Sequence, residues 1–275
     1  MAGVESISIA TKPIDRPAWY RSRHGETVLS VLVFVAVLVV WWAYVTYANI
    51  SPLVLPTPQA VAQALIDNTS NAFLLEHSWV TLSEILLGFL LGSGLGVVLG
   101  TATALSPVLR NVLGPYIIAS QAMPKLALAP IMVIWLGFGI APKVVIAALI
   151  CFFPLLENTI IGLTSVNPYQ VELFRSLTAN GWQTFFKLRI PNALPIIFAG
   201  LRVAITLAVV GAVVGEYVGA NRGLGALIIV AQGSFDTPLM FALFVYLTVI
   251  GVVLYKAMEY LERTFFAWRY IRRGD

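Results

Sequence analysis

The chain has 275 residues, of which 59% are hydrophobic and only 11% are Asp, Glu, Lys or Arg. Soluble domains carry about 25% charged residues, so this composition excludes an ordinary soluble enzyme and a disordered chain, and it indicates an integral membrane protein. The net charge is +4, and the basic residues crowd both ends of the chain, so we expect membrane lipid rather than nucleic acid around the protein.

The hydrophobic residues gather in runs long enough to cross a membrane, which takes about 20 residues each. The first run, 27–47, is too long for the apolar core of a signal peptide, and no small-residue cleavage site follows it. We therefore predict an all-α fold, a polytopic membrane bundle of six transmembrane helices at 27–47, 80–105, 112–136, 144–163, 194–214 and 239–260.

The charges of the loops orient this predicted bundle. Segment 48–78 has no Lys or Arg, so we expect it outside, where Thr57 and Pro58 would begin a short interfacial helix. Lys143 and Arg222 fall outside as exceptions. The basic residues expected inside, between spans two and three and between spans four and five, are Arg110, Arg175, Lys187 and Arg189. Both termini are then cytoplasmic, N-in and C-in.

Spans two and three contain residues that favour close packing and bending. Glycines recur every fourth residue in span two, a pattern that forms a groove for a neighbouring helix within the subunit or in a second copy. Pro124 and Pro130 remove backbone hydrogen bonds and bend span three, either to line a pathway or to pack. The four glycines are Gly88, Gly92, Gly96 and Gly100.

Ionisable residues within spans are costly in a membrane and are therefore candidates for function. Glu84 and Glu157 are close enough to span ends for their side chains to reach the headgroups. Lys125, Arg202 and Glu216 are candidates, with Pro130, for a translocation pathway or gate.

The sequence lacks recognisable catalytic machinery. The single Cys151 excludes a disulfide framework, and neither histidine lies in a predicted span. A phosphate-binding Gly-rich loop of the type GxxxxGK[ST] is absent, so the chain is not expected to bind ATP in that manner. We predict no catalytic residue, no metal site and no cofactor in this chain.

The cytoplasmic stretch after span four is unusually apolar for a loop. Asn167 and Gln170 suggest a capping box, with Pro168 at the first helical position. Asn180 and Gly181 would end this helix, and a second short helix would follow at 182–188. Because the exposed aromatic side chains exceed what a solvated loop carries, we expect a protein partner here.

This stretch resembles a motif of the inner-membrane permease subunits of ABC importers, written EAA, three residues, G, nine residues, I, one residue, LP. The matching positions are Glu172, Leu173, Phe174, Thr178, Leu188, Ile190 and Pro191, with Trp182 in the intervening stretch. Thr178 departs from the Gly, and Leu173 and Phe174 depart from the two Ala. Stretches 124–130, 135–139, 215–217 and 223–225 are similar to the branch that imports nitrate, sulfonates, taurine, bicarbonate and pyrimidine precursors.

The resemblance implies a type I importer permease fold with a defined domain organisation. The expected segments are a cytoplasmic tail 1–26, a first helix 27–47, an outer loop 48–74, a transmembrane domain 75–262 with a coupling loop 167–190, and a basic tail 263–275. It implies two copies of an ATPase subunit, which bind ATP and Mg, on the coupling loop. It also implies a second permease copy and an extracytoplasmic solute-binding protein.

An ion-gradient-driven secondary transporter is the alternative, but the two halves show no convincing repeat. For the solute, the resemblance to this branch implies a small anion or a heteroaromatic precursor. The charges of Lys125 and Arg202 favour the anion, sulfonate-, nitrate- or taurine-like, with a pyrimidine or vitamin precursor next.

Overall fold

The computed structural model describes residues 23–69 and 72–265, and the regular structure of these residues is helical throughout. The chain divides into two compact units, residues 1–59 and 60–275. Most of the two basic tails expected from the sequence, residues 1–22 and 266–275, lies outside the described residues.

The first unit consists mainly of α1, Arg23–Tyr47, followed by an irregular segment. The part Gly25–Tyr47 has a mean hydropathy of 2.6 and nearly coincides with the first predicted span. Helix α2, Pro58–Thr69, begins at the proline expected to start it, where the fixed φ of Pro suits a first helical turn.

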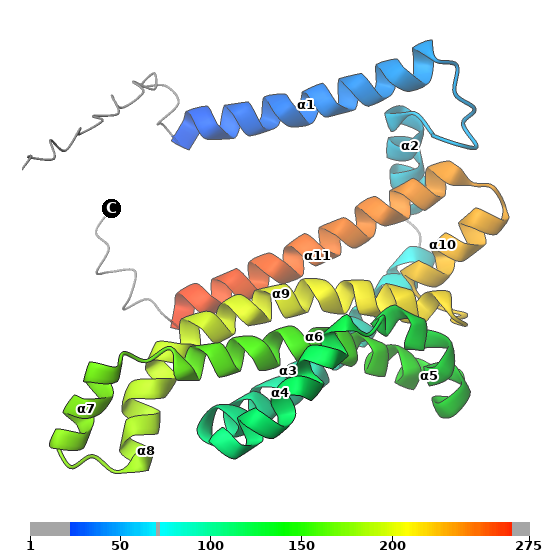
Figure 1. Cartoon of the computed structure of the whole chain (residues 1–275). Coiled ribbons are helices and arrows are strands. Elements are labelled where there is room, and N and C mark those ends of the chain that lie inside the picture. Colours follow the sequence, from blue (N-terminus) through cyan, green and yellow to red (C-terminus); the bar gives the residue numbers. More distant parts are fainter. Residues whose placement is uncertain (1–22, 70–71, 266–275) are drawn as a thin grey trace, which may run out of the picture. The chain divides into compact units, whose positions relative to one another are not determined.

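Four long helices form the second unit: α3 Ala72–Leu105, α6 Ile140–Thr164, α9 Ile190–Tyr217 and α11 Thr237–Phe265. Helix α6 packs against both α3 and α9, and α11 packs against α9 (Figure 1). By length and composition, the described residues contain five helices able to cross a membrane, or six if one sharply bent pair counts as a single span.

The bent pair is the third predicted span, which is broken rather than simply kinked. Helix α4, Pro107–Ala122, ends before Pro124, and the chain continues through the 3₁₀ turn η2, Lys125–Leu128, into α5, Ala129–Leu136. The two halves meet at 84°. Pro124 cannot continue the hydrogen-bond ladder of α4, and Pro130 occupies the first turn of α5, where no donor is needed.

Short helices occupy both ends of this unit. Helices α7, Pro168–Ser176, and α8, Gly181–Thr184, lie together at one end (Figure 1). Helix α10, Leu224–Gly233, lies near the opposite end with α5 and was not predicted from the sequence. Its ten residues are too few for a span, and their uniform hydrophobicity reflects packing against α9, α11 and α3.

The four spaced glycines of α3 lie on the face that contacts α6. A Cβ atom on Gly96 would come within 2.9 Å of the Phe152 carbonyl oxygen, and one on Gly100 within 2.8 Å of the Leu156 carbonyl oxygen. At Gly92 it would overlap the backbone of Ala148. The glycines therefore serve packing within the subunit, where the two backbones approach closely.

We expect Gly92→Ala to lower the stability of the purified permease by about 1–3 kcal/mol, since the added methyl group overpacks the α3–α6 contact. Thermal unfolding in detergent measures the effect. The control is Gly94→Ala on the same helix, where a Cβ would meet nothing within 4 Å. Equal stability of the two variants would contradict this account of the packing.

Candidate functional site: the α7–α8 loop and the buried charges

Helix α7 is capped at both ends by its own sequence. The side chain of Asn167 accepts a hydrogen bond from the Tyr169 amide at 2.9 Å, as an N-cap should. At the other end Thr178 has φ +55°, its amide donates to the Arg175 carbonyl, and the Ala179 amide donates to the Phe174 carbonyl. These two bonds form a Schellman motif, whose left-handed residue is usually glycine.

Thr178 thus occupies the position at which the permease motif has Gly. Its positive φ gives the physical reason for that Gly. A residue with a Cβ in the left-handed region costs about 1–2 kcal/mol, and glycine avoids this cost. With Thr in place of Gly, residue 178 keeps the left-handed backbone conformation, and the Cβ atom adds local strain.

The reciprocal capping box lies at the second short helix instead of the first. The Asn180 side chain accepts from the Gln183 amide at 2.8 Å, and the Gln183 side chain accepts from the Asn180 amide at 2.9 Å. The expected partner of Asn167, Gln170, contributes only a backbone bond among the described residues. Asn180 therefore both follows α7 and starts α8, because its side chain satisfies free amides there.

The second short helix is also continuous with the following span, whereas the sequence predicted a short helix at 182–188 and a separate span at 194–214. Helix α8 passes into a π-helical turn, η3 Phe185–Arg189, and directly into α9, so that Gly181–Tyr217 is one helical run. The Ile190 amide donates to the carbonyl of Phe185, five residues back. This wider turn precedes Pro191 and Pro195, which cannot donate to the helix ladder.

The aromatic side chains of α8 and of the η3 turn lie in two different environments. Trp182 is 72% exposed and stacks on Phe186, with ring centroids 5.5 Å apart. Phe185 points the other way and packs against the core cluster of Ala104, Leu163 and Ala193. Of the remaining motif residues, Glu172 and Leu173 are exposed, while Phe174, Leu188 and Pro191 are half-buried.

A cluster of polar side chains lies at the α10 end and centres on Glu216, the buried carboxylate near the end of α9. Glu216 accepts a hydrogen bond from the Thr81 hydroxyl at 2.6 Å and another from the Gly225 amide. The Thr81 hydroxyl accepts from the Leu224 amide at 2.8 Å. His77 Nδ1 lies 2.9 Å from the Gly223 nitrogen and 3.0 Å from its oxygen. The free amides at the start of α10 are thus satisfied by side chains of α3 and α9.

Glu84 and Lys143 form a buried ion pair beside this cluster, with 2.7 Å between Nζ and Oε1. The sequence interpretation of Glu84 was wrong, because its side chain is buried and does not extend to the headgroups, and Lys143, expected on the outer side, is buried as well. The two lie in different helices, α3 and α6, and no single-sequence signal pairs them. They border a cavity of about 430 Å³ that is also lined by Phe138 and Arg222.

The four candidates for a translocation pathway do not converge on one site. Lys125 Nζ lies 4.7 Å from the ring centroid of Phe153, and Arg202 pairs with Glu262 of α11 at 3.3 Å. Glu216 belongs to the cluster at the α10 end, and Pro130 lies in the first turn of α5. Each charged candidate thus has its own local partner.

Comparison with known proteins gives this helical architecture a family. Residues 92–266 match the family described as binding-protein-dependent transport system inner membrane component. The chain is 39% identical to the riboflavin transport system permease protein RibX of Chloroflexus aurantiacus, over 96% of this chain and 97% of that protein. It is 36% identical to the formylaminopyrimidine transport permease protein ThiX of Halalkalibacterium halodurans, over 90% and 98%. It is 31% identical to the taurine transport system permease protein TauC of Escherichia coli, over 91% and 92%.

The chain therefore belongs to the family of binding-protein-dependent transport system inner membrane components. It is a multi-pass inner-membrane protein and a transport subunit, not an enzyme. Its fold is similar to that of the MetNI methionine ABC transporter in an inward-facing conformation, with a TM-score of 0.62 and 19% identity over 72% of this chain and 98% of that one. The family expected from the coupling motif is confirmed.

We expect Thr178→Gly to stabilise the end of α7, because glycine adopts φ +55° without steric cost. The gain is about 1 kcal/mol, and slower hydrogen exchange of the Thr178 and Ala179 amides measures it. The control is Ser176→Gly at the last residue of α7, where the backbone is still helical, so exchange should be faster because glycine is a poorer helix former than serine. Faster exchange in Thr178→Gly would contradict the strain argument.

Proposed function

We propose that the chain is the permease subunit of an ATP-driven importer that receives a small solute from an extracytoplasmic binding protein. The observation that carries the proposal is the capped helix α7, followed by a helical run from Gly181 to Tyr217 without a break. A partner that moves α7 and α8 would act directly on a helix that reaches the far end of the unit. Membership of the family supports this mode of energy supply over an ion gradient.

The ATPase subunit docks, in this proposal, on the exposed apolar face of α7. Tyr169, Leu173 and Leu177 follow one another at four-residue spacing and are 80%, 57% and 67% exposed. Side chains four residues apart lie on one side of a helix. Glu172 and Phe174 flank this face, and Trp182 extends the apolar surface onto α8.

Replacing Leu173 by Asp is expected to uncouple ATP hydrolysis from uptake or to release the ATPase, because a charge would enter the centre of an apolar contact. Transport and ATPase activity in reconstituted vesicles measure the effect. We choose Leu173 over Phe174 because Leu173 is exposed whereas Phe174 is half-buried, so a charge at Phe174 would mix docking with folding.

The matched control for this charge is Ser234→Asp, an exposed position in the turn before α11. It should leave assembly, ATP hydrolysis and uptake unchanged. Normal coupling of ATP hydrolysis to uptake in Leu173→Asp would contradict the docking proposal.

The orientation that supports this function has six spans, with the broken pair α4–α5 counted as one, and both termini in the cytoplasm. The cytoplasmic side is then the α7–α8 end, and the α10 end faces outward. The positive side chains near α7 and α8, Arg175, Lys187 and Arg189, favour this choice.

Two permease copies, two ATPase subunits and one binding protein complete the proposed assembly. The solute path runs between the two copies, since the described charges within the spans of one copy form no continuous polar route: Glu84, Arg202 and Glu216 each have a local partner. The mass of the solubilised complex tests the copy number, and one permease copy, or two different ones, would overturn the homodimer.

For the solute, the sequence favoured a small anion because of Lys125 and Arg202, and this stays a prediction. The pairing of Arg202 with Glu262 removes part of its basis, because a compensated charge attracts an anion weakly. A heteroaromatic solute is the second candidate, favoured by the relatives named for riboflavin and formylaminopyrimidine, which are 39% and 36% identical.

We expect Lys125→Met and Arg202→Met, each in a correctly assembled complex, to distinguish the two candidates. Uptake of taurine-like anions should fall in both variants if the charges serve the path, whereas uptake of a heteroaromatic solute should change little. Unchanged transport of every accepted solute would remove the argument for an anion.

A further inference from the structure

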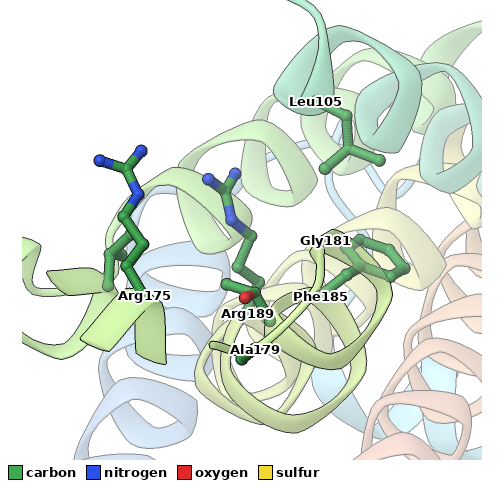
Figure 2. A pocket seen from close by; sticks show the side chains of 8 residues that line it. Leu105, Arg175, Ala179, Gly181, Phe185 and Arg189 are labelled. Carbon is green, nitrogen blue, oxygen red and sulfur yellow. The ribbon is translucent and has the colours of Figure 1, made fainter. Parts of the chain in front are cut away.

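A pocket of about 320 Å³ lies between α7, the η3 turn and the end of α3. Its lining combines apolar side chains, among them Leu105, Val171 and Phe185, with two arginines, Arg175 and Arg189. Figure 2 shows both guanidinium groups extending to the same side of the loop, the side on which Leu105 lies. None of the lining residues is acidic.

The two guanidinium groups are available for a ligand. Within the described part of the chain, neither Arg175 nor Arg189 has a side-chain hydrogen bond or an ion pair, and Arg189 is half-buried. A guanidinium held partly out of water without a counter-charge is a favourable partner for an anion, and its planar donors suit the oxygens of a phosphate.

This pocket is distinct from the docking face of α7. Val171 and Arg175 are four residues apart and share a side of the helix. At about 100° per residue, that side lies opposite the exposed face of Tyr169, Leu173 and Leu177. A partner bound to the docking face would leave the pocket facing the helical bundle.

The place of the pocket at a helix end indicates the kind of anion. Leu105 is the last residue of the apolar helix Phe73–Leu105, which is long and apolar enough to cross a membrane, so the pocket lies at the end of a candidate span. Apolar walls at this level fit the glycerol and upper acyl region of a lipid, and two arginines beside them fit its phosphate. Basic pockets at helix ends on the cytoplasmic side bind anionic headgroups in this way.

We propose that this pocket binds the headgroup of an anionic phospholipid, with the phosphate held by Arg175 and Arg189. The inference rests on the proposed orientation, in which the α7–α8 end is cytoplasmic. A lipid held there would join α7 to the end of α3. It would thereby set the resting position of the α7–α8 loop, which the ATPase moves in the proposed function.

Native mass spectrometry of the full-length permease, released from vesicles of phosphatidylglycerol and phosphatidylcholine, tests the site. We expect phosphatidylglycerol to be retained preferentially. Arg175→Gln and Arg189→Gln should each lower that retention about fivefold, the usual effect of one basic residue at an anionic membrane surface. Lys187→Gln is the matched control, because Lys187 is exposed on the same turn, carries the same charge and does not line the pocket.

Three results would overturn the proposal. The first is equal retention of the two lipids, or equal loss in Lys187→Gln. The second is displacement of phosphatidylglycerol by an equal concentration of inorganic phosphate, which would assign the site to a free anion. The third is loss of the ATPase from Arg175→Gln without loss of lipid, which would assign the arginines to an acidic side chain of the ATPase.

The outcome is separable from that of the proposed function. If Arg189→Gln fails to assemble, Arg175→Gln alone carries the test, because Arg175 is exposed and its side chain makes no hydrogen bond or ion pair within the described chain. Uncoupling by Leu173→Asp with unchanged lipid retention in the arginine variants would leave the transport proposal intact and refute only the lipid site.

Discussion

The close contact of α3 with α6 is the constraint on which the second unit depends. Glycines at every fourth position let the two backbones touch, and α6 in turn packs against α9, which packs against α11. In a membrane, apolar side chains gain little from meeting each other, because lipid is equally apolar. Van der Waals contact between closely packed backbones therefore has to stabilise the bundle, as hydrophobic burial does in water. The glycine groove of α3 allows this close contact.

The charges buried in this bundle act mainly as links between helices. Glu84 of α3 pairs with Lys143 of α6, Arg202 of α9 pairs with Glu262 of α11, and Glu216 of α9 joins Thr81 to the start of α10. An unpaired charge at these depths would be costly, and removing one partner would leave the other in that state. The arrangement thus ties the short helix α10 to the long helices without exposing polar backbone to lipid.

Mechanical continuity connects the two ends of the unit. From Gly181 to Tyr217 the chain is helical throughout, and it begins beside α7 and ends at the Glu216 cluster. A displacement of α8 would therefore be transmitted along one helix to the Glu216 end of the unit. The π-helical turn at Phe185–Arg189 is the point at which this run is least regular, which makes it a natural place for small changes in direction.

The sequence by itself determined the membrane class, the positions of the long helices, the glycine face and the capped helix α7, because hydrophobic length, residue spacing and capping residues are local properties. It also predicted the bend at Pro124. The tertiary structure alone decided that Glu84 meets Lys143, that Arg202 meets Glu262, and that α10 begins on the carboxylate of Glu216. The members of the two ion pairs are far apart in the chain, Glu216 and Gly225 face each other across a turn, and all three contacts depend on helix packing. Without that packing, an isolated charge in a span looks the same whether it lines a path, reaches the headgroups or neutralises a neighbour.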